Sequence, residues 1–522
     1  MQSVYVPSQS LRRAVAHCQG VLRRVVLSTA AAVAATGLVS SPLMADVSLP
    51  NIFSDHMVLQ QAQKNRVWGK AEAGEAVTVT INKQTQMATA DKDGLWQVML
   101  EPLPVGGPYE LNVKGKNEIK LADILVGEVW VCSGQSNMQW SVNASNDADL
   151  ETLAAKHPNL RMINFPQIGT QEPIWTHDDR KWQVCTPETV GGFSAVGYFF
   201  ARQLNETLDV PIGMINNAWG GSSCEGWINR DVLAADPKFA PLMARWVGME
   251  KSYADLKASA DAKPDQVKQL DSQMKGNARP GNIYNGVLKS HLGYGIRGAI
   301  WYQGESNAGR AYQYRELFPL MISNWRKEWN QGDFPFYWVQ LADFQAEQAE
   351  PGESAWAELR EAQTMTMAKL PNTGEAVIID IGEGKDIHPK NKVDVGRRLA
   401  RWALAKDYGV NVPFHSPQYK SMEKSANAIV VTFDHVGSGW RPFDVPSPVG
   451  FAIAGEDKKF VWADAKVVDG NKISLSSEKV PNPVAVRYAW ADNPVCNMYS
   501  NSGLPLTPFR SDDWPGQTVD AQ

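Results

Sequence analysis

A serine in a glycine turn is the first residue in this sequence that could do chemistry. Ser136 lies in the stretch Ser-Gly-Gln-Ser-Asn-Met at 133–138, directly after the apolar run 128–132. A serine at the carboxyl end of a buried strand, in a turn leading into a helix, can present its hydroxyl as a nucleophile beside backbone N–H groups. Serine and asparagine are equally favoured as helix caps, so this stretch alone leaves both interpretations open. Met138 also replaces the final glycine of the G-x-S-x-G turn.

A serine nucleophile needs a base that is itself oriented by a third group. His388 lies in Asp-Ile-His-Pro at 386–389, after an apolar run and before a helical pattern. Asp386, two residues upstream, could reach Nδ1 of His388 and leave Nε2 for Ser136. Such a stretch is also typical of a surface turn. His291, before a Gly-Tyr-Gly turn, is a weaker competitor as the base.

Two further segments follow expected strand ends and could stabilise an oxyanion. They are Asn-Ala-Trp-Gly-Gly-Ser-Ser at 217–223 and Trp-Tyr-Gln-Gly-Glu-Ser-Asn at 301–307. Acyl transfer develops negative charge on a carbonyl oxygen, and a glycine N–H with a carboxamide N–H are suitable donors for it. The glycines could equally form a helix-entry turn, and Gln303 could be a buried, hydrogen-bonded amide.

The elements that must position these residues are predicted by alternating patterns between about 123 and 408. Short β-branched runs alternate there with helical patterns, which predicts a parallel sheet covered by helices. Strands are expected at 129–132, 212–216, 298–302, 336–341 and 376–381, and helices near 193–208, 312–329 and 354–368. The charged stretch 236–276 has a helical period and exceeds a normal connection, so we expect a helical insertion there.

Period-two alternation marks both flanks of this α/β region. Between 46 and 122 it occurs in runs such as 77–81 and 96–100, which predicts a small antiparallel β-domain, a sandwich. It returns after 409, in 428–433 and 483–488. We therefore expect three domains: an N-terminal β-sandwich at 46–122, an α/β domain at 123–408 and a C-terminal β-rich domain at 409–522.

The first 45 residues predict a cleaved export signal. They contain four arginines and no acidic residue, an apolar run at 25–39 that is short for a membrane span, and Leu-Met-Ala at 43–45 as a cleavage site. The mature chain is expected to be periplasmic or secreted. Without the signal, 47 basic residues of the original 51 remain against 56 acidic ones, a net charge of −9. That charge argues against nucleic acid or an anionic membrane as a partner.

Four cysteines remain after the signal, and none forms a C-x-x-C pair: Cys132, Cys185, Cys224 and Cys496. No metal site or other cofactor is therefore expected. An oxidising compartment would allow one or two disulfides, in three possible pairings that the sequence does not distinguish. Cys132 lies in an apolar run and could equally be a buried free thiol.

Together, the four stretches resemble the SGNH-hydrolase superfamily, specifically its sialate O-acetylesterase branch. The blocks occur in that branch's order: Gly-Gln-Ser-Asn-Met at 134–138, Trp-Gly-Gly-Ser at 219–222, Tyr-Gln-Gly-Glu at 302–305 and Asp-Ile-His-Pro-Lys-Asn-Lys at 386–392. The resemblance continues in both β-rich flanks, at 53–60 and 486–490, and so covers nearly all of the mature chain. It implies a three-layer, flavodoxin-like α/β domain and a serine carbohydrate O-acetylesterase that works without metal or cofactor.

The resemblance also implies a role for each matching residue. It makes Ser136 the nucleophile, His388 the base and Asp386 its orienting partner, with the N–H of Ser136, Gly220 and Gln303 as oxyanion donors. The wider superfamily has asparagine where this chain has Gln303, and its acid stands three residues before the histidine, not two as Asp386 does. The branch shares both features. Its Gly-x-Ser/Thr pattern favours Gly220 over Gly221, although the sequence does not fix which N–H points inward.

The substrate is less well defined by the sequence. The branch's name suggests O-acetylated sialic acid, whose carboxylate would need a positioned arginine or lysine. The nearest basic residues in sequence are Arg310 and Lys385, and both lie outside the blocks around Ser136, Gly220 and Gln303. Acetylated hemicellulose such as xyloglucan or xylan is therefore an alternative. A second alternative is a non-catalytic glycan-binding protein, because 19 tryptophans outnumber 16 phenylalanines and 14 tyrosines.

Overall fold

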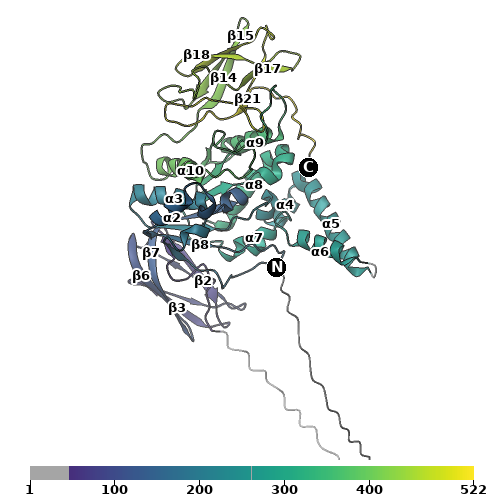
Figure 1. The fold of residues 1–522 in the computed structure, drawn as a ribbon. Coiled ribbons are helices and arrows are strands. Elements are labelled where there is room, and N and C mark those ends of the chain that lie inside the picture. Colours follow the sequence, from purple (N-terminus) through teal and green to yellow (C-terminus); the bar gives the residue numbers. More distant parts are fainter. Residues whose placement is uncertain (1–45, 260–261, 522) are drawn as a thin grey trace, which may run out of the picture. The chain divides into compact units, whose positions relative to one another are not determined.

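The structure of the protein is a computed structural model that describes residues 46–259 and 262–521 (Figure 1). The expected export signal, 1–45, lies outside the described residues. Within the described ranges, no helix combines the length and apolar character needed to cross a membrane.

A parallel sheet forms the centre of the α/β region. Its strands lie in the order β13-β12-β11-β7-β10-β8, and β9 pairs antiparallel with β8 at the edge. They are β7 (Glu118–Gly134), β8 (His157–Asn164), β9 (Gln183–Cys185), β10 (Ile212–Asn216), β11 (Gly298–Tyr302), β12 (Phe336–Val339) and β13 (Thr373–Ala376). The predicted α/β fold class is confirmed.

Helices cover both faces of this sheet, as alternate residues along β7 demonstrate. Trp130 and Cys132 are buried with α3 (Ala195–Leu208) and α10 (Lys392–Lys406). Val129 and Val131 belong to the core that includes α8 (Ala311–Trp329) and α9 (Ala355–Lys369). Because successive side chains of a strand point to opposite faces, the sheet is the middle of three layers.

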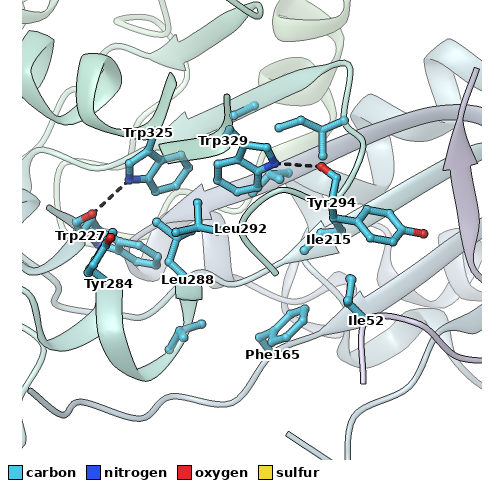
Figure 2. Close-up of a cluster of buried hydrophobic side chains, with 14 of the residues drawn as sticks. Ile52, Phe165, Ile215, Trp227, Tyr284, Leu288, Leu292, Tyr294, Trp325 and Trp329 are labelled. Carbon is cyan, nitrogen blue, oxygen red and sulfur yellow. Dashed lines mark hydrogen bonds between the residues drawn. The ribbon is translucent and has the colours of Figure 1, made fainter. Parts of the chain in front are cut away.

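The layer under α8 is rich in tryptophan. Figure 2 shows Trp325 and Trp329 of α8 above Trp227, Tyr294 and neighbouring leucines. The indole N–H of Trp325 donates to the carbonyl of Trp227 at 3.1 Å, and that of Trp329 donates to the carbonyl of Tyr294 at 2.9 Å. These indole rings therefore serve the core, with their polar atoms satisfied, and offer no free face to a sugar.

One expected strand is displaced, and two strands, β8 and the short edge strand β9, were missed. The run 376–381 is apolar, yet β13 ends at Ala376. Val377 and Ile379 enter the core of the C-terminal sheets, whereas Ile378 is buried under α3 and α10. The run is therefore apolar because it passes between two cores. Strand β8 was missed because Pro158 and Arg161 interrupt its apolar pattern.

The N-terminal flank is β-structure, as the alternation predicts. Its strands are β1 (Val58–Gln60), β2 (Asn65–Lys70), β3 (Ala76–Ile81), β4 (Gln84–Thr89), β5 (Leu95–Leu100) and β6 (Gly106–Lys114). Strands β2 and β5 form one pair, and β4-β3-β6 joins the first half of β7. Since β7 continues into the central sheet, the boundary expected at 122–123 falls inside one continuous strand.

The C-terminal flank consists of two four-stranded antiparallel sheets, β14-β15-β19-β18 and β17-β16-β20-β21. Their strands are β14 (Gln418–Ser425), β15 (Ala428–Asp434), β16 (Phe451–Ala454), β17 (Phe460–Trp462), β18 (Asp464–Asp469), β19 (Lys472–Ser476), β20 (Ala485–Tyr488) and β21 (Phe509–Arg510). A shared apolar core includes Ile429, Ile453 and Val486.

The other α-helices are α1 (Ser136–Gln139), α2 (Ala148–Ala154), α4 (Arg230–Ala235), α5 (Ala240–Ala258), α6 (Pro264–Met274) and α7 (Asn282–Gly286). Helices α5 and α6 lie within the stretch expected to be a helical insertion. The cysteines left open by the sequence are all free thiols: Cys132, Cys185, Cys224 and Cys496. No disulfide joins these four residues in this structure.

Candidate active site

The nucleophile turn lies where β7 ends and α1 begins. Gly134 has a φ of +129°, and a Cβ at this position would collide with the carbonyl oxygen of Tyr302. Only glycine therefore fits here, because L side chains rarely adopt this backbone conformation. Ser136 is the first residue of α1, so its N–H has no acceptor within that helix. The chain thus presents the hydroxyl of Ser136 beside a free backbone donor.

The structure brings His388 to Ser136 across 252 residues of sequence. Nε2 of His388 lies 2.8 Å from Oγ of Ser136, which is a hydrogen-bond distance. Burial lowers the pKa of His388 below its usual range, Asp386 raises it, and the charge of Lys392 lowers it. A histidine with a lowered pKa is neutral at pH 7 and can accept a proton from the serine hydroxyl.

Asp386 contacts His388 mainly through the backbone. Its Oδ1 accepts the main-chain N–H of His388 at 2.9 Å and lies 3.6 Å from Nδ1. The second distance allows an ion pair and is too long for a hydrogen bond. Asp386 is therefore beside His388, as expected. Its hydrogen bond is to the backbone of His388, while its distance to the imidazole ring is longer.

Trp140 provides a second restraint on the histidine that the sequence did not reveal. Its ring stacks on the imidazole of His388, with centroids 4.7 Å apart and planes 13° from parallel. The indole N–H donates to the carbonyl of Ala144 at 2.7 Å, which fixes the ring. No spacing rule predicts such a contact, because the two residues are distant in sequence.

Gly220 also lies beside the nucleophile. A Cβ on Gly220 would lie 3.3 Å from Cβ of Ser136, whereas one on Gly221 would contact only Asn277 within 4 Å. The N–H of Gly220 donates to the side-chain oxygen of Gln139 at 2.7 Å. Between the two glycines that the sequence left open, Gly220 is thus the one next to Ser136.

Gln303 is buried, and its amide is fully engaged. Nε2 donates to the carbonyl of Ser222 at 3.1 Å and to Oδ1 of Asn307 at 2.7 Å, while Oε1 accepts the hydroxyl of Tyr314 at 2.8 Å. Both amide hydrogens therefore have protein acceptors, and neither is directed at the Ser136 hydroxyl.

The remaining candidates named from the sequence lie elsewhere. His291 is fully buried, receives a hydrogen bond from Asn217 at 3.0 Å, and has a pKa lowered to about 3 by burial. Arg310 pairs with Glu225 at 2.7 Å, and Lys385 is exposed. Across residues 46–259 and 262–521, no three His, Cys, Asp or Glu side chains form a cluster that could hold a metal ion.

A cavity of about 710 Å³ opens over Ser136 and His388. Its polar walls include Gln139, Asn164 and Asn216, and Arg180 is the basic side chain among its lining residues besides His388. Arg180 belongs to the segment before β9 and pairs with Asp179 at 3.1 Å, on the exposed side of the molecule. No pattern in the sequence indicates that this arginine lies near the serine, since it is far from all four motifs.

The chain is similar to known carbohydrate esterases. The model of the carbohydrate esterase family described as sialic acid-specific acetylesterase matches residues 126–258 and 272–405. The mouse sialate O-acetylesterase is 29% identical over 516 residues, covering 87% of this chain and 92% of the mouse protein. The human protein is 29% identical over 504 residues, covering 87% and 91%. A solved carbohydrate acetylesterase from Xanthomonas citri is 37% identical, with a TM-score of 0.78 over 90% of this chain and all of the other.

The three-layer fold and these relatives therefore define a carboxylic ester hydrolase, a carbohydrate acetylesterase. The chain belongs to the sialic acid-specific acetylesterase family of carbohydrate esterases. The resemblance predicted from the four sequence blocks is confirmed. The alternative of a non-catalytic glycan-binding protein is not supported.

Proposed function

We propose that the protein is a serine O-acetylesterase that releases acetate from O-acetylated sugars through Ser136, His388 and Asp386. The observation that carries this proposal is the 2.8 Å contact between Nε2 of His388 and Oγ of Ser136. A serine hydroxyl is a weak nucleophile alone, and a neutral imidazole at hydrogen-bond distance is the group that activates it.

The proposed reaction has two halves. Oγ of Ser136 attacks the acetyl carbonyl while Nε2 of His388 takes its proton, and the sugar alkoxide leaves with that proton, which gives an acetyl-serine and the free sugar hydroxyl. Water then attacks the acetyl-serine and loses a proton to His388, which passes it to Oγ of Ser136 as the acetyl–Oγ bond breaks, so acetate leaves and both residues are restored. Asp386 stabilises the imidazolium that forms in each half, because its carboxylate is 3.6 Å from Nδ1.

The N–H groups of Ser136 and Gly220 and the amide of Gln303 are the proposed oxyanion donors. Two of them have to exchange partners when the substrate binds. Gly220 would leave the side-chain oxygen of Gln139, and Gln303 would leave the carbonyl of Ser222 or Oδ1 of Asn307. Each donor keeps a hydrogen bond after this exchange, whereas the acceptor that it leaves loses one.

For the substrate, Arg180 favours a sugar that carries a carboxylate, such as O-acetylated sialic acid. The catalytic cavity presents this guanidinium with no carboxylate among the residues that line it. Arginine binds carboxylates through two parallel hydrogen bonds. Its pair with the exposed Asp179 is weak and can be exchanged. Acetylated xyloglucan and xylan, which are neutral, remain the alternative substrates. The proposed location is periplasmic or secreted, which rests on the expected export signal.

One experiment tests both the proposed mechanism and the proposed substrate. Acetate release is compared, at equal ester concentration, from O-acetylated sialic acid and from acetylated xyloglucan, xylan and mannan. The wild-type protein and the variants Ser136→Ala and Arg180→Met are used. Ser136→Ala should lose all release, and Arg180→Met should raise KM on the sialic acid ester alone. Full activity of Ser136→Ala would refute the mechanism, whereas equal loss on neutral sugars would refute the role of Arg180.

A further inference from the structure

A chain of three side chains, two of them buried and the third half-buried, lies beside the nucleophile. Nζ of Lys392 lies 2.6 Å from Oδ1 of Asn137, and Nδ2 of Asn137 lies 2.7 Å from Oε1 of Glu305. Asn137 and Lys392 are almost completely excluded from solvent. The three residues come from three of the four sequence blocks, so this contact joins segments that are distant in the chain.

Asn137 also connects the nucleophile to the base. It follows Ser136 in sequence, and Nδ2 donates to the carbonyl of Ile387 at 3.0 Å, the residue before His388. The ammonium of Lys392 can only donate and the carbonyl of Ile387 can only accept, so these two partners fix which end of the amide faces each. The side chain of Asn137 therefore ties the turn that carries the serine to the loop that carries the histidine.

Lys392 occupies a position that is unfavourable for a lysine. It is the first residue of α10, where the helix dipole is positive, and it is fully buried. Burial lowers its pKa to about 7, although the charges of Glu305, Glu383 and Asp386 oppose this shift. A buried ion pair as a whole can often be replaced by apolar side chains without loss of stability, so the burial of this lysine is not by itself evidence that it stabilises the fold.

The ammonium also lies against the aromatic ring that stacks on the base. Nζ is 5.9 Å from the ring of Trp140 and 5.4 Å from that of Tyr302. A cation at this distance is attracted to an aromatic face. Lys392 therefore contacts two groups that restrain the catalytic pair: Asn137, which ties the two loops, and Trp140, which stacks on His388.

We propose that Lys392 is a positioning residue that keeps Ser136 and His388 at hydrogen-bond distance by fixing the side chain of Asn137. This inference rests on the proposed function, in which these two residues are the nucleophile and the base. Lys392 itself does not reach the reacting atoms. Its removal frees the amide of Asn137 to rotate and loosens the link to Ile387, so the 2.8 Å contact between serine and histidine is no longer enforced.

The test replaces Lys392 with methionine, which is similar in length and carries no charge. Small misplacements of reacting groups cost on the order of 10²-fold in rate, so kcat on a small activated acetyl ester should fall by roughly that factor with little change in KM. Lys385→Met is the matched control, because Lys385 lies in the loop that carries His388 and is exposed. It should retain wild-type kcat.

A pH profile separates positioning from a general loss of structure. The charged groups that face His388 are Asp386, which raises its pKa, and Lys392, which lowers it. Removal of the lysine should therefore raise the pKa of His388 and move the acid limb of kcat/KM to higher pH. Lys392→Arg, which keeps the charge and a donor, should return the limb toward its wild-type position.

A double-mutant cycle tests whether the lysine acts through Asn137. The double variant Lys392→Met/Asn137→Ala should lose no more activity than the worse single variant, because both changes break one chain of contacts. If Lys392→Met does not fold, Asn137→Ala alone should lower kcat by the same order with the acid limb unmoved. Wild-type kcat in either folded single variant, or fully additive losses, would overturn the positioning role. Full activity of Ser136→Ala would instead overturn the proposed function.

Discussion

The two sides of Ser136 differ in how complete they are without substrate. On the base side, His388 already contacts the hydroxyl at 2.8 Å, with Trp140 stacked on its ring. On the oxyanion side, the N–H of Gly220 is bound to Gln139, and both amide hydrogens of Gln303 have internal acceptors. The proposed base is therefore in place in advance, while two of the proposed oxyanion donors have to exchange hydrogen bonds. A motif identifies which segments meet, but not whether their donors are free.

The largest effects are expected on the base side. Ser136→Ala and His388→Ala should each lower kcat on an activated acetyl ester by roughly 10⁴ to 10⁶, because the two residues act as a unit. The double variant should therefore lose little more than either single variant. Steady-state kinetics with matched circular dichroism spectra provide the measurement. Clearly additive losses would mean that another group serves as the base.

A smaller loss is expected for Asp386→Asn. Loss of the orienting carboxylate costs up to about 10⁴ in rate when it holds the ring directly. Here its Oδ1 is 3.6 Å from Nδ1, and stacking by Trp140 also restrains the imidazole, so we expect a loss of about 10² to 10³. Trapping of the acetyl-enzyme by intact-mass spectrometry would show which half-reaction slows. Unchanged kcat would leave a serine–histidine pair as the working machinery.

On the oxyanion side, Gln303→Ala should lower kcat by roughly 10² to 10³ with a smaller change in KM if the amide reaches the transition state. The same substitution breaks three buried hydrogen bonds, so the melting temperature has to be measured with it. Tyr314→Phe is the control, since it removes one bond from the same amide and leaves Nε2 intact. Equal kcat losses in both variants would assign Gln303 to structural support alone.

Part of the fold and of the candidate site could be predicted from the sequence. The alternation of short apolar runs and helical patterns predicted the central sheet, and the position of Ser136 after β7 followed from that pattern. The contact of His388 with Ser136 followed from the resemblance. The contacts of Trp140, Arg180 and Lys392 could not be found in this way, although Lys392 lies within one of the four blocks. Their roles depend on packing between distant segments, which leaves no local spacing or composition signal.

The errors in the strands predicted from the sequence have a related cause. An apolar run indicates burial, and burial alone does not distinguish a strand from a segment that crosses between two cores, as at 377–379. Conversely, Arg161 is buried inside β8 because its guanidinium pairs with Asp123 at 2.6 Å. A charged residue in a sheet strand is satisfied by a partner 38 residues away, and no sequence pattern identifies that partner.

The smallest expected effect concerns the acidity of the base. Trp140→Ala removes the ring stacked on His388 and admits water to the imidazole. Because burial is the main cause of the lowered pKa of His388, this variant should raise that pKa toward its usual value of about 6.5. The protonated form is inactive as a base, so the acid limb of kcat/KM should move to higher pH. Activity should therefore fall more at pH 6 than at pH 8, and Trp140→Phe, which retains an aromatic face, should shift the limb less. Profiles that fall in parallel at all pH values would mean that Trp140 orients the histidine without changing its acidity.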